Sequence, residues 1–240
     1  MKRVSSGIMR RFTSALTATV VLMNLANAAG DLVWFNGRFD GRNGLASERN
    51  TQVSDARTYE DFSLPSGYNQ VTGLLGQFYL TSDLVNAPVY WEIRQGVAPG
   101  TGGTLIAAGT QSGATYTFLG SGFGLVIYEI RMKLDTPVTL VPYTVYWMTM
   151  APVGNGGGRA FVCTTSGVGA IGAPIGGNNA IFDSTFFNLP RWVPVAGNIF
   201  SDPTLANFSY GVQAIPEPAS MLALGAGLAG LLGLRRRARK

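Results

Sequence analysis

Short apolar and aromatic runs, separated by Gly, Pro and Asn, fill residues 31–214 and restrict the folds open to this chain. No stretch of useful length there has the 3.6-residue period of a helix. In residues 89–94, apolar side chains at 89, 91 and 93 alternate with Tyr, Glu and Arg, as on a strand with one buried face. Ten or so such strands, spaced about ten residues apart, predict an all-β fold: a single β-sandwich with jelly-roll-like topology.

Residues 1–28 have the organisation of a secretory signal peptide. Basic residues at 2, 3, 10 and 11 precede a mostly apolar, uncharged stretch at 12–25. Ala26, Asn27 and Ala28 then form the small-x-small pattern that signal peptidase cleaves, so we expect cleavage after Ala28. A retained N-terminal anchor is the alternative, and the polar residues within the apolar stretch argue against it.

The last 25 residues, 216–240, combine three features in a fixed order. The motif Pro216-Glu217-Pro218 comes first, and its prolines bar a helix from entering from upstream. Residues 219–234 are mostly apolar and would form about 24 Å of helix at 1.5 Å per residue, a short membrane span. A basic cluster ends the chain: Arg235, Arg236, Arg237, Arg239 and Lys240. It is expected to stay cytoplasmic, which leaves everything before Pro216 outside.

This tail resembles the PEP-CTERM sorting signal of Gram-negative bacteria that make extracellular polysaccharide. The resemblance implies export across the inner membrane, recognition of the Pro-Glu-Pro motif by an exosortase, and removal of the helix and basic tail. Phrases at 59–65, 91–96, 103–110 and 138–147 are similar to carbohydrate-module-like ectodomains that are common in such proteins. We therefore divide the chain into a signal peptide (1–28), a β-sandwich ectodomain (29–214) and a sorting signal (215–240).

The basic character of the chain belongs to its two ends. The whole sequence carries a net charge of +5, but residues 29–215 hold nine basic and twelve acidic residues, a net charge of −3. Nucleic acid is therefore excluded as a charge-driven partner of the exported body. A single cysteine, Cys163, permits no intrachain disulfide and is expected to be a small buried apolar residue in a strand.

The absence of histidine, together with the single cysteine, excludes several kinds of chemistry. Ser-His-Asp and Cys-His systems and structural zinc sites cannot be assembled, and no glycine-rich phosphate loop opens a helix. Carboxylate catalysis remains open, because a glycosidase needs two acids about 5 to 9.5 Å apart. The candidate acids are Glu92, Glu129 and the pair Glu60 and Asp61. The alternative is that the acids face solvent and pair with basic neighbours, namely Arg94, Arg131 and Lys133.

Sandwich modules that bind carbohydrate stack sugar rings on exposed aromatic side chains. Two tryptophans, Trp91 and Trp147, have apolar neighbours at period two and are expected in the core. The other two, Trp34 and Trp192, lie beside turn residues and are the candidate carbohydrate contacts. Calcium is a weak candidate ligand of the oxygen-rich segment 40–44, and an Asx-type turn is the better account of that segment. We otherwise expect no cofactor and no metal.

These observations predict a non-catalytic protein of the cell envelope or extracellular matrix. Its expected partners are signal peptidase and exosortase during export, the inner membrane transiently, and extracellular polysaccharide. A carbohydrate-active hydrolase with paired carboxylates is the alternative.

Overall fold

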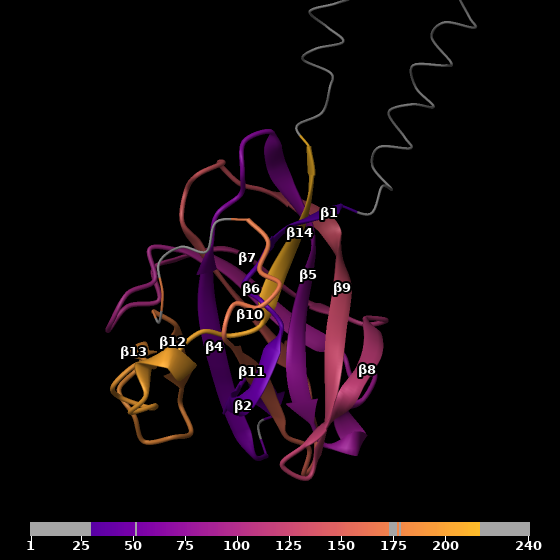
Figure 1. Ribbon diagram of the computed structural model, residues 1–240, viewed down its shortest axis with the longest axis vertical. Helices are drawn as coiled ribbons and strands as arrows, with labels where there is room; N and C mark the ends of the chain where they lie inside the picture. The colour runs from indigo at the N-terminus through magenta and orange to yellow at the C-terminus, as the bar shows by residue number, and fades with distance from the viewer. Residues whose placement is uncertain (1–29, 51, 173–176, 178, 217–240) are drawn as a thin grey trace, which may run out of the picture.

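The computed structural model describes residues 30–50, 52–172, 177 and 179–216 (Figure 1). The predicted signal-peptide cleavage site at Ala26 and Ala28 lies outside the described residues. So do Glu217 and Pro218 of the sorting motif, the apolar segment after them and the basic cluster at 235–240. Within the described ranges, no helix is long and apolar enough to cross a membrane.

Strands account for nearly all the regular structure of the described residues, which include no α-helix. The fourteen strands are β1 (Asp31–Phe35), β2 (Phe39–Ala46), β3 (Glu48–Asn50), β4 (Ser54–Phe62), β5 (Tyr68–Leu80), β6 (Val89–Gln95), β7 (Thr104–Gln111), β8 (Thr115–Gly122), β9 (Leu125–Thr139), β10 (Tyr146–Pro152), β11 (Ala160–Thr165), β12 (Ile181–Ser184), β13 (Val193–Pro194) and β14 (Tyr210–Pro216). Two single-turn 3-10 helices, η1 (Ser82–Leu84) and η2 (Pro203–Leu205), lie in connections.

The strands form two seven-stranded sheets that face each other. The first sheet has the order β1-β14-β5-β11-β2, with β9 on the other side of β5 and β8 beyond β9. The second has the order β13-β12-β4-β10-β6-β7, with β3 also paired to β4. Neighbouring strands in both sheets are antiparallel. The prediction of an all-β sandwich is thus confirmed.

The core between the sheets follows from the alternation of side chains along each strand. On β9, Ile130 and Met132 point into the core, whereas Glu129 and Arg131 lie on the outer face. On β6, Trp91 and Ile93 belong to the same core cluster. Burying each large apolar side chain stabilises the fold by about 1.5–3 kcal/mol, so this alternation fixes which face of each strand turns inward.

The chain enters and leaves the sandwich at the same end. Strand β1 pairs with β14, and Asp31 lies opposite Ala214. Both strands reach the upper end of the molecule in Figure 1. Strand β14 continues to Pro216, two residues beyond the boundary predicted at 214, so the first residue of the sorting motif belongs to the last strand that the structure describes.

Cys163 lies on β11 and is fully buried, as predicted. Its neighbours are Tyr79 and Ile127, which form a small apolar cluster on the outer face of the first sheet. Burial raises the pKa of the Cys163 thiol well above its usual range. The thiol is therefore protonated at neutral pH and closed to reagents in the folded state.

Candidate functional site

Strand β7 is an edge strand whose inward-facing residues are small. Opposite the inner residues Trp91 and Ile93 of β6 lie Gly109 and Ala107 of β7. A sandwich normally fills such positions with large side chains, so the space beside the edge of this sheet is left open. The elements that border this space are β7 and β9, which approach each other across the flank of the sandwich.

Glycine at position 109 allows the indole of Trp91 to lie against the edge strand. A Cβ at position 109 would sit 3.0 Å from the Nε1 atom of Trp91 and 3.2 Å from its Cε2 atom. A larger residue would therefore push the indole away from β7. The ring instead forms a wall of the open space and keeps only 6 % of its surface exposed.

Strand β9 supplies the opposite wall through a wide bulge. Its pairing with β5 is regular up to Lys133, opposite Gly73, and resumes at Val138, opposite Val71. The four residues 134–137 thus face a single residue of β5, and among them Leu134 is buried while Asp135 is exposed. Bulges of this kind redirect side chains, and the bulge includes Pro137, which has no N–H to donate to the ladder.

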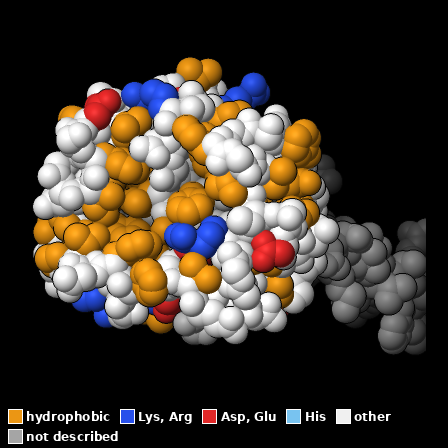
Figure 2. Space-filling model, turned by 90° about the horizontal axis from the view of Figure 1, so that it is seen from below, with side chains coloured by type: hydrophobic (Ala, Val, Ile, Leu, Met, Phe, Trp, Pro, Cys, Tyr) orange, Lys and Arg blue, Asp and Glu red, His pale blue; other side chains and the backbone are white. Residues whose placement is uncertain are grey.

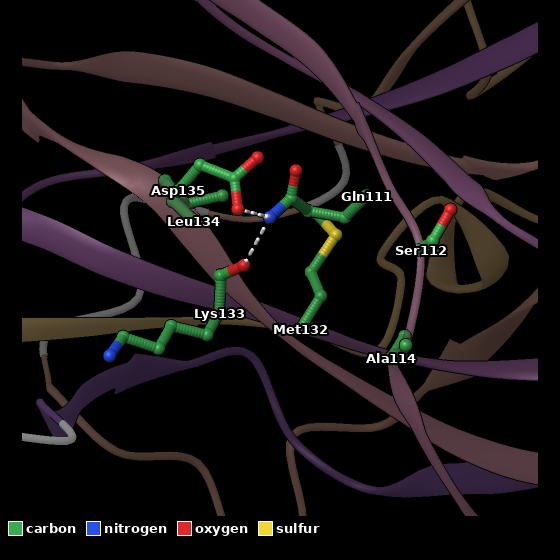
Figure 3. Close-up of a pocket in the computed structure, with 8 residues that line it drawn as sticks. Gln111, Ser112, Ala114, Met132, Lys133, Leu134 and Asp135 are labelled. Atoms are coloured by element: carbon green, nitrogen blue, oxygen red, sulfur yellow. Dashed lines mark hydrogen bonds between the residues drawn. The ribbon is translucent and has the colours of Figure 1, made fainter.

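The side chain of Gln111 joins the two walls (Figure 3). Its Nε2 group donates hydrogen bonds to the carbonyl oxygen of Lys133 at 2.8 Å and to Oδ1 of Asp135 at 2.7 Å. Two hollows lie on either side of this link. One, of about 300 Å³, is lined by residues 111–114 and 132–135; the other, of about 390 Å³, by Trp91 and residues 107–111 and 135–138. We refer to the larger hollow as the flank cleft.

One residue that lines the flank cleft, Trp91, has an unsatisfied hydrogen-bond donor. Its Nε1–H group is buried and has no acceptor among the residues that the structure describes. Leaving a buried donor unpaired costs about 1–3 kcal/mol, a penalty that a bound acceptor would remove once the indole turned toward the cleft. Asp135, Thr110 and Thr136 also line the cleft and offer oxygen atoms. Asp135 is the one acid in this lining, so the cleft can bind a hydroxylated molecule but does not present a pair of carboxylates.

Trp34 does not have the position that the sequence predicted. Its side chain is 1 % exposed and packs in the core against Phe62, with the ring centroids 6.0 Å apart. The prediction that it contacts carbohydrate is therefore wrong. The prediction took Asn36, two residues further on, as a sign of an exposed turn. Asn36 is instead buried and donates to the carbonyl oxygen of Phe208.

The other three tryptophans are packed against neighbouring side chains. The expected burial of Trp91 and Trp147 is confirmed, although Trp147 lies in a second cluster on the outer face of the second sheet. Trp192 is half-buried beside that cluster: its ring lies 5.0 Å from the ring of Tyr59 and 5.0 Å from the guanidinium carbon of Arg94. Its role as a carbohydrate contact stays a prediction.

Glu92 and Glu129 do not converge on a common site. Glu92 lies on β6 of the second sheet and Glu129 on β9 of the first, and both point away from the core between the sheets. Because facing sheets are already about 10 Å apart, two outward carboxylates on opposite sides exceed the 5 to 9.5 Å that a glycosidase requires. Glu60 and Asp61 diverge as well, since consecutive residues of β4 point to opposite faces.

Glu92 is instead the centre of a polar network on the outer face of the second sheet. Its carboxylate accepts hydrogen bonds from the hydroxyls of Tyr90 at 2.6 Å and Tyr59 at 2.8 Å, from Nη1 of Arg57 at 2.9 Å and from Nε of Arg94. Burial alone would raise the pKa of Glu92, but the hydrogen bonds from Tyr90, Arg94 and Tyr59 outweigh it and lower the pKa below its usual value. This carboxylate is fully engaged and available to no substrate.

Glu60 points inward and is buried at the base of a smaller cavity of about 160 Å³. Its Oε2 atom accepts a hydrogen bond from the backbone N–H of Phe208 at 2.8 Å. Burial, and then the nearby charge of Asp61, raise the pKa of Glu60 well above its usual value of 4.5. Burial also raises the pKa of Asp61 to about 6.

We expect Glu60→Gln to flatten the pH dependence of stability. The folded state holds the Glu60 proton at pH values where the unfolded chain has released it, so the free energy of unfolding falls as the pH rises above about 4.5. Asp61 contributes a slope of the same sign that ends above about 6. Urea unfolding between about pH 6 and pH 8 should show a falling stability for the parent and a flatter one for Glu60→Gln. Equal slopes of stability against pH for the parent and Glu60→Gln would contradict a protonated Glu60 in the folded state. Asp202→Asn, at an exposed site, is the control and should keep the parental slope.

The segment 40–44 forms the Asx turn that was the alternative to a calcium site. The backbone N–H of Arg42 donates to Oδ1 of Asp40 at 3.0 Å, and the Nε of the same arginine lies 2.9 Å from Oδ2. Thr164 donates to Oδ1 as well, at 2.7 Å. Among the residues that the structure describes, no group of three or more Asp, Glu or Cys side chains is placed to hold a metal ion.

Fold and chain end together define the class of this protein: an antiparallel β-sandwich whose final strand runs directly into a sorting segment. Residues 214–237 match the family model described as the PEP-CTERM protein-sorting motif. The chain is therefore a protein with a PEP-CTERM sorting signal, which marks it for export, for processing by an exosortase and for association with the envelope of a Gram-negative bacterium. A comparison with curated proteins found no match.

Proposed function

We propose that this protein is a non-catalytic component of the cell envelope or extracellular matrix that binds polysaccharide in the flank cleft. The unpartnered indole N–H of Trp91 is the observation that carries the proposal. The sorting motif supports delivery to an envelope rich in polysaccharide, with transient residence in the inner membrane. The strand orders β1-β14-β5-β9 and β4-β10-β6-β7 interleave early and late strands and support the predicted jelly-roll topology.

A saccharide fits the chemistry of the flank cleft. Each sugar hydroxyl both donates and accepts, so one hydroxyl can accept from Trp91 while others donate to Asp135 or Thr136. The indole also gives the apolar surface on which the C–H groups of a sugar pack. A volume of about 390 Å³ lies within the usual range of ligand sites. The cleft is open at the edge of the sheet, as a long polymer requires.

The absence of a second acid in the lining of the cleft favours binding over hydrolysis. A retaining or inverting glycosidase places two carboxyl groups across the scissile bond. Asp135 lines the cleft without such a partner, and its Oδ1 atom is held by Gln111. Glu92 and Glu129, the other candidate pair for a hydrolase, lie on different sheets and do not share a site.

The test compares two tryptophan variants in a polysaccharide panel. Trp91→Phe keeps an aromatic ring but removes the N–H donor, so affinity for the bound polysaccharide should fall about tenfold, the value of one hydrogen bond of about 1.4 kcal/mol. Trp34→Phe is the matched control, because Trp34 is also a core residue with an unpartnered N–H, on a strand that does not border the flank cleft. Affinity electrophoresis of the full-length proteins measures both.

Three outcomes of this assay contradict the proposal. Equal affinities of Trp91→Phe and the parent would remove the flank cleft as the site. Loss of affinity in Trp192→Ala alone would place the site on the outer face of the second sheet. Reproducible release of reducing ends would show an enzyme. No release is expected from any substrate.

A further inference from the structure

The ends of β14, β5 and β9 lie side by side at the end of the sandwich from which the chain leaves. Gln70 at the start of β5 pairs with Ile215 of β14 on one side and with Thr139 of β9 on the other. Pro216 lies opposite Tyr68, two residues earlier. The β9–β10 connection, residues 140–145, therefore begins one strand away from the last residues of β14, at the upper end of Figure 1.

The β9–β10 connection exposes three large side chains at this end. Val141 is 62 % exposed and Tyr143 is 75 % exposed, and Val145 is exposed as well. The backbone beneath them is held in place: the N–H of Tyr143 donates to the carbonyl oxygen of Leu64 at 2.9 Å. We call Val141, Tyr143 and Val145 the apolar tip.

Tyr143 occupies a backbone conformation that disfavours a tyrosine. Its φ angle is +58°, in the left-handed region that glycine or asparagine normally supplies. A bulky residue is strained there, and such strain persists where the surrounding structure fixes the backbone, as the hydrogen bond from Tyr143 to Leu64 does here. Here the conformation presents an aromatic ring to the outside.

The two connections that form the apolar tip and its support are uncharged, although Asp31 is exposed at the same end and accepts a hydrogen bond from Tyr68. Neither the β4–β5 turn at 63–67 nor the stretch 136–146 contains Asp, Glu, Lys or Arg. A surface that binds through charge would need basic or acidic side chains here, whereas an uncharged apolar loop with an exposed tyrosine suits the interfacial layer of a lipid bilayer.

The length of the remaining chain brings this end close to the membrane. Two residues, Glu217 and Pro218, separate Pro216 from the apolar segment that begins at Ala219. At no more than about 3.6 Å per residue, Pro216 and Ala219 are within about 11 Å of each other. If the apolar segment lies in the bilayer, as the sorting function requires, the upper end of the sandwich lies at the headgroups.

We propose that, before exosortase cleavage, the apolar tip docks on the lipid surface of the inner membrane. This proposal rests on the sorting signal acting as a membrane segment. The docked tip and the chain at Pro216 hold the sandwich by two points, which fixes its orientation and presents the sorting motif at a constant height above the bilayer. Cleavage would remove one of these points and release the protein, because so small an apolar loop binds lipid weakly by itself.

Exposure alone does not single out the apolar tip, since the opposite end of the molecule also gathers apolar side chains on its surface (Figure 2). Phe123, at the hairpin between β8 and β9, is 70 % exposed and has a φ angle of +55°. It precedes β9, whereas Tyr143 follows β9, so the two are separated by a strand of fifteen residues, roughly 50 Å at about 3.3 Å per residue. Phe123 is therefore the matched control.

The experiment measures lipid contact at both ends of β9. Val141→Cys and Phe123→Cys in the full-length protein receive an environment-sensitive fluorophore in the native state, in which Cys163 is buried. The proteins are reconstituted in phosphatidylethanolamine–phosphatidylglycerol vesicles with nitroxide-labelled lipid. We expect a blue shift and strong quenching at position 141 and neither at position 123. Adding Tyr143→Gly to Val141→Cys should abolish most of the quenching without unfolding the chain, because glycine adopts a positive φ freely.

Flotation of the same vesicles separates the two hypotheses. If the full-length protein floats with lipid but position 141 is quenched no more than position 123, docking is overturned and the membrane segment stands. Quenching that Tyr143→Gly leaves unchanged also overturns docking through the apolar tip. If the protein does not float, the sorting segment fails to enter the bilayer, and the proposed route of export falls with it.

Discussion

A variant with alanine in place of Pro216, Glu217 and Pro218 is expected to accumulate in the inner membrane as uncleaved protein. The match to the sorting motif covers these residues, and the resemblance implies that an exosortase recognises them. The change should not disturb folding, because Pro216 is exposed at the very end of β14 and contributes no backbone N–H to the sheet. Immunoblots of membrane and released fractions from an exosortase-positive host measure the outcome, which should be nearly all-or-none.

Thr139→Ala is the matched control for this experiment, since Thr139 is exposed at the same end of the sandwich and lies outside the motif. If the variant with alanine at 216–218 were processed and released at the parental rate, the sorting function of the motif would be contradicted. Deleting residues 235–240 tests topology separately: retention before cleavage should weaken, because the basic cluster is expected to hold the C-terminus on the cytoplasmic face.

The strands that sequence reasoning identified well are those with strict alternation. In β6 the period of two predicted both the strand and its buried face, and Trp91 and Ile93 lie in the core as expected. Burial of one face is the dominant free-energy term in such strands, so a local pattern is enough to reveal it.

Pairing between distant strands was not predictable from local pattern. Alternation shows that Glu92 and Glu129 both point outward, but it does not reveal that their strands belong to opposite sheets. The predicted exposure of Trp34 was wrong for a similar reason. Its polar neighbour Asn36 suggests a loop, but Asn36 donates to Phe208, 172 residues away, and lies at a buried strand end.

The sequence did not predict the flank cleft, although some of the residues that form it break the pattern of their strands. Small residues at 107 and 109 interrupt the apolar face of β7, and Pro137 interrupts β9. Each of these features alone is compatible with an ordinary edge strand. Only the pairing of Trp91 with Gly109, and the bulge that brings Asp135 toward Gln111, turn them into a cleft.

The polar network of Glu92 predicts the largest effect on stability. In Glu92→Gln the buried centre of the network loses its charge, and the guanidinium groups of Arg57 and Arg94 lose their carboxylate. Breaking a buried ion pair by removing one partner costs about 3–5 kcal/mol. Both arginines keep some contact with solvent, and Arg57 retains Asp55 at 3.3 Å, so we expect a loss of about 3 kcal/mol in the free energy of unfolding.

The same substitution at Glu129 is the control, because Glu129 and its partner Arg131 are both more exposed than the Glu92 network. Exposed pairs contribute up to about 1 kcal/mol, so Glu129→Gln should cost no more than that. Urea unfolding of both variants at neutral pH gives the comparison. Equal costs would show that the Glu92 network does not stabilise the fold as its geometry requires.

The pH dependence provides an independent test of the Glu92 network. Because the pKa of Glu92 is lower in the folded state than its usual value of 4.5, its contribution is complete above about 4.5 and is lost as the pH falls through the folded pKa. The stability difference between the parent and Glu92→Gln should therefore shrink in acid. A difference that stayed constant down to about pH 3 would mean that the lost stability comes from packing and not from the carboxylate charge.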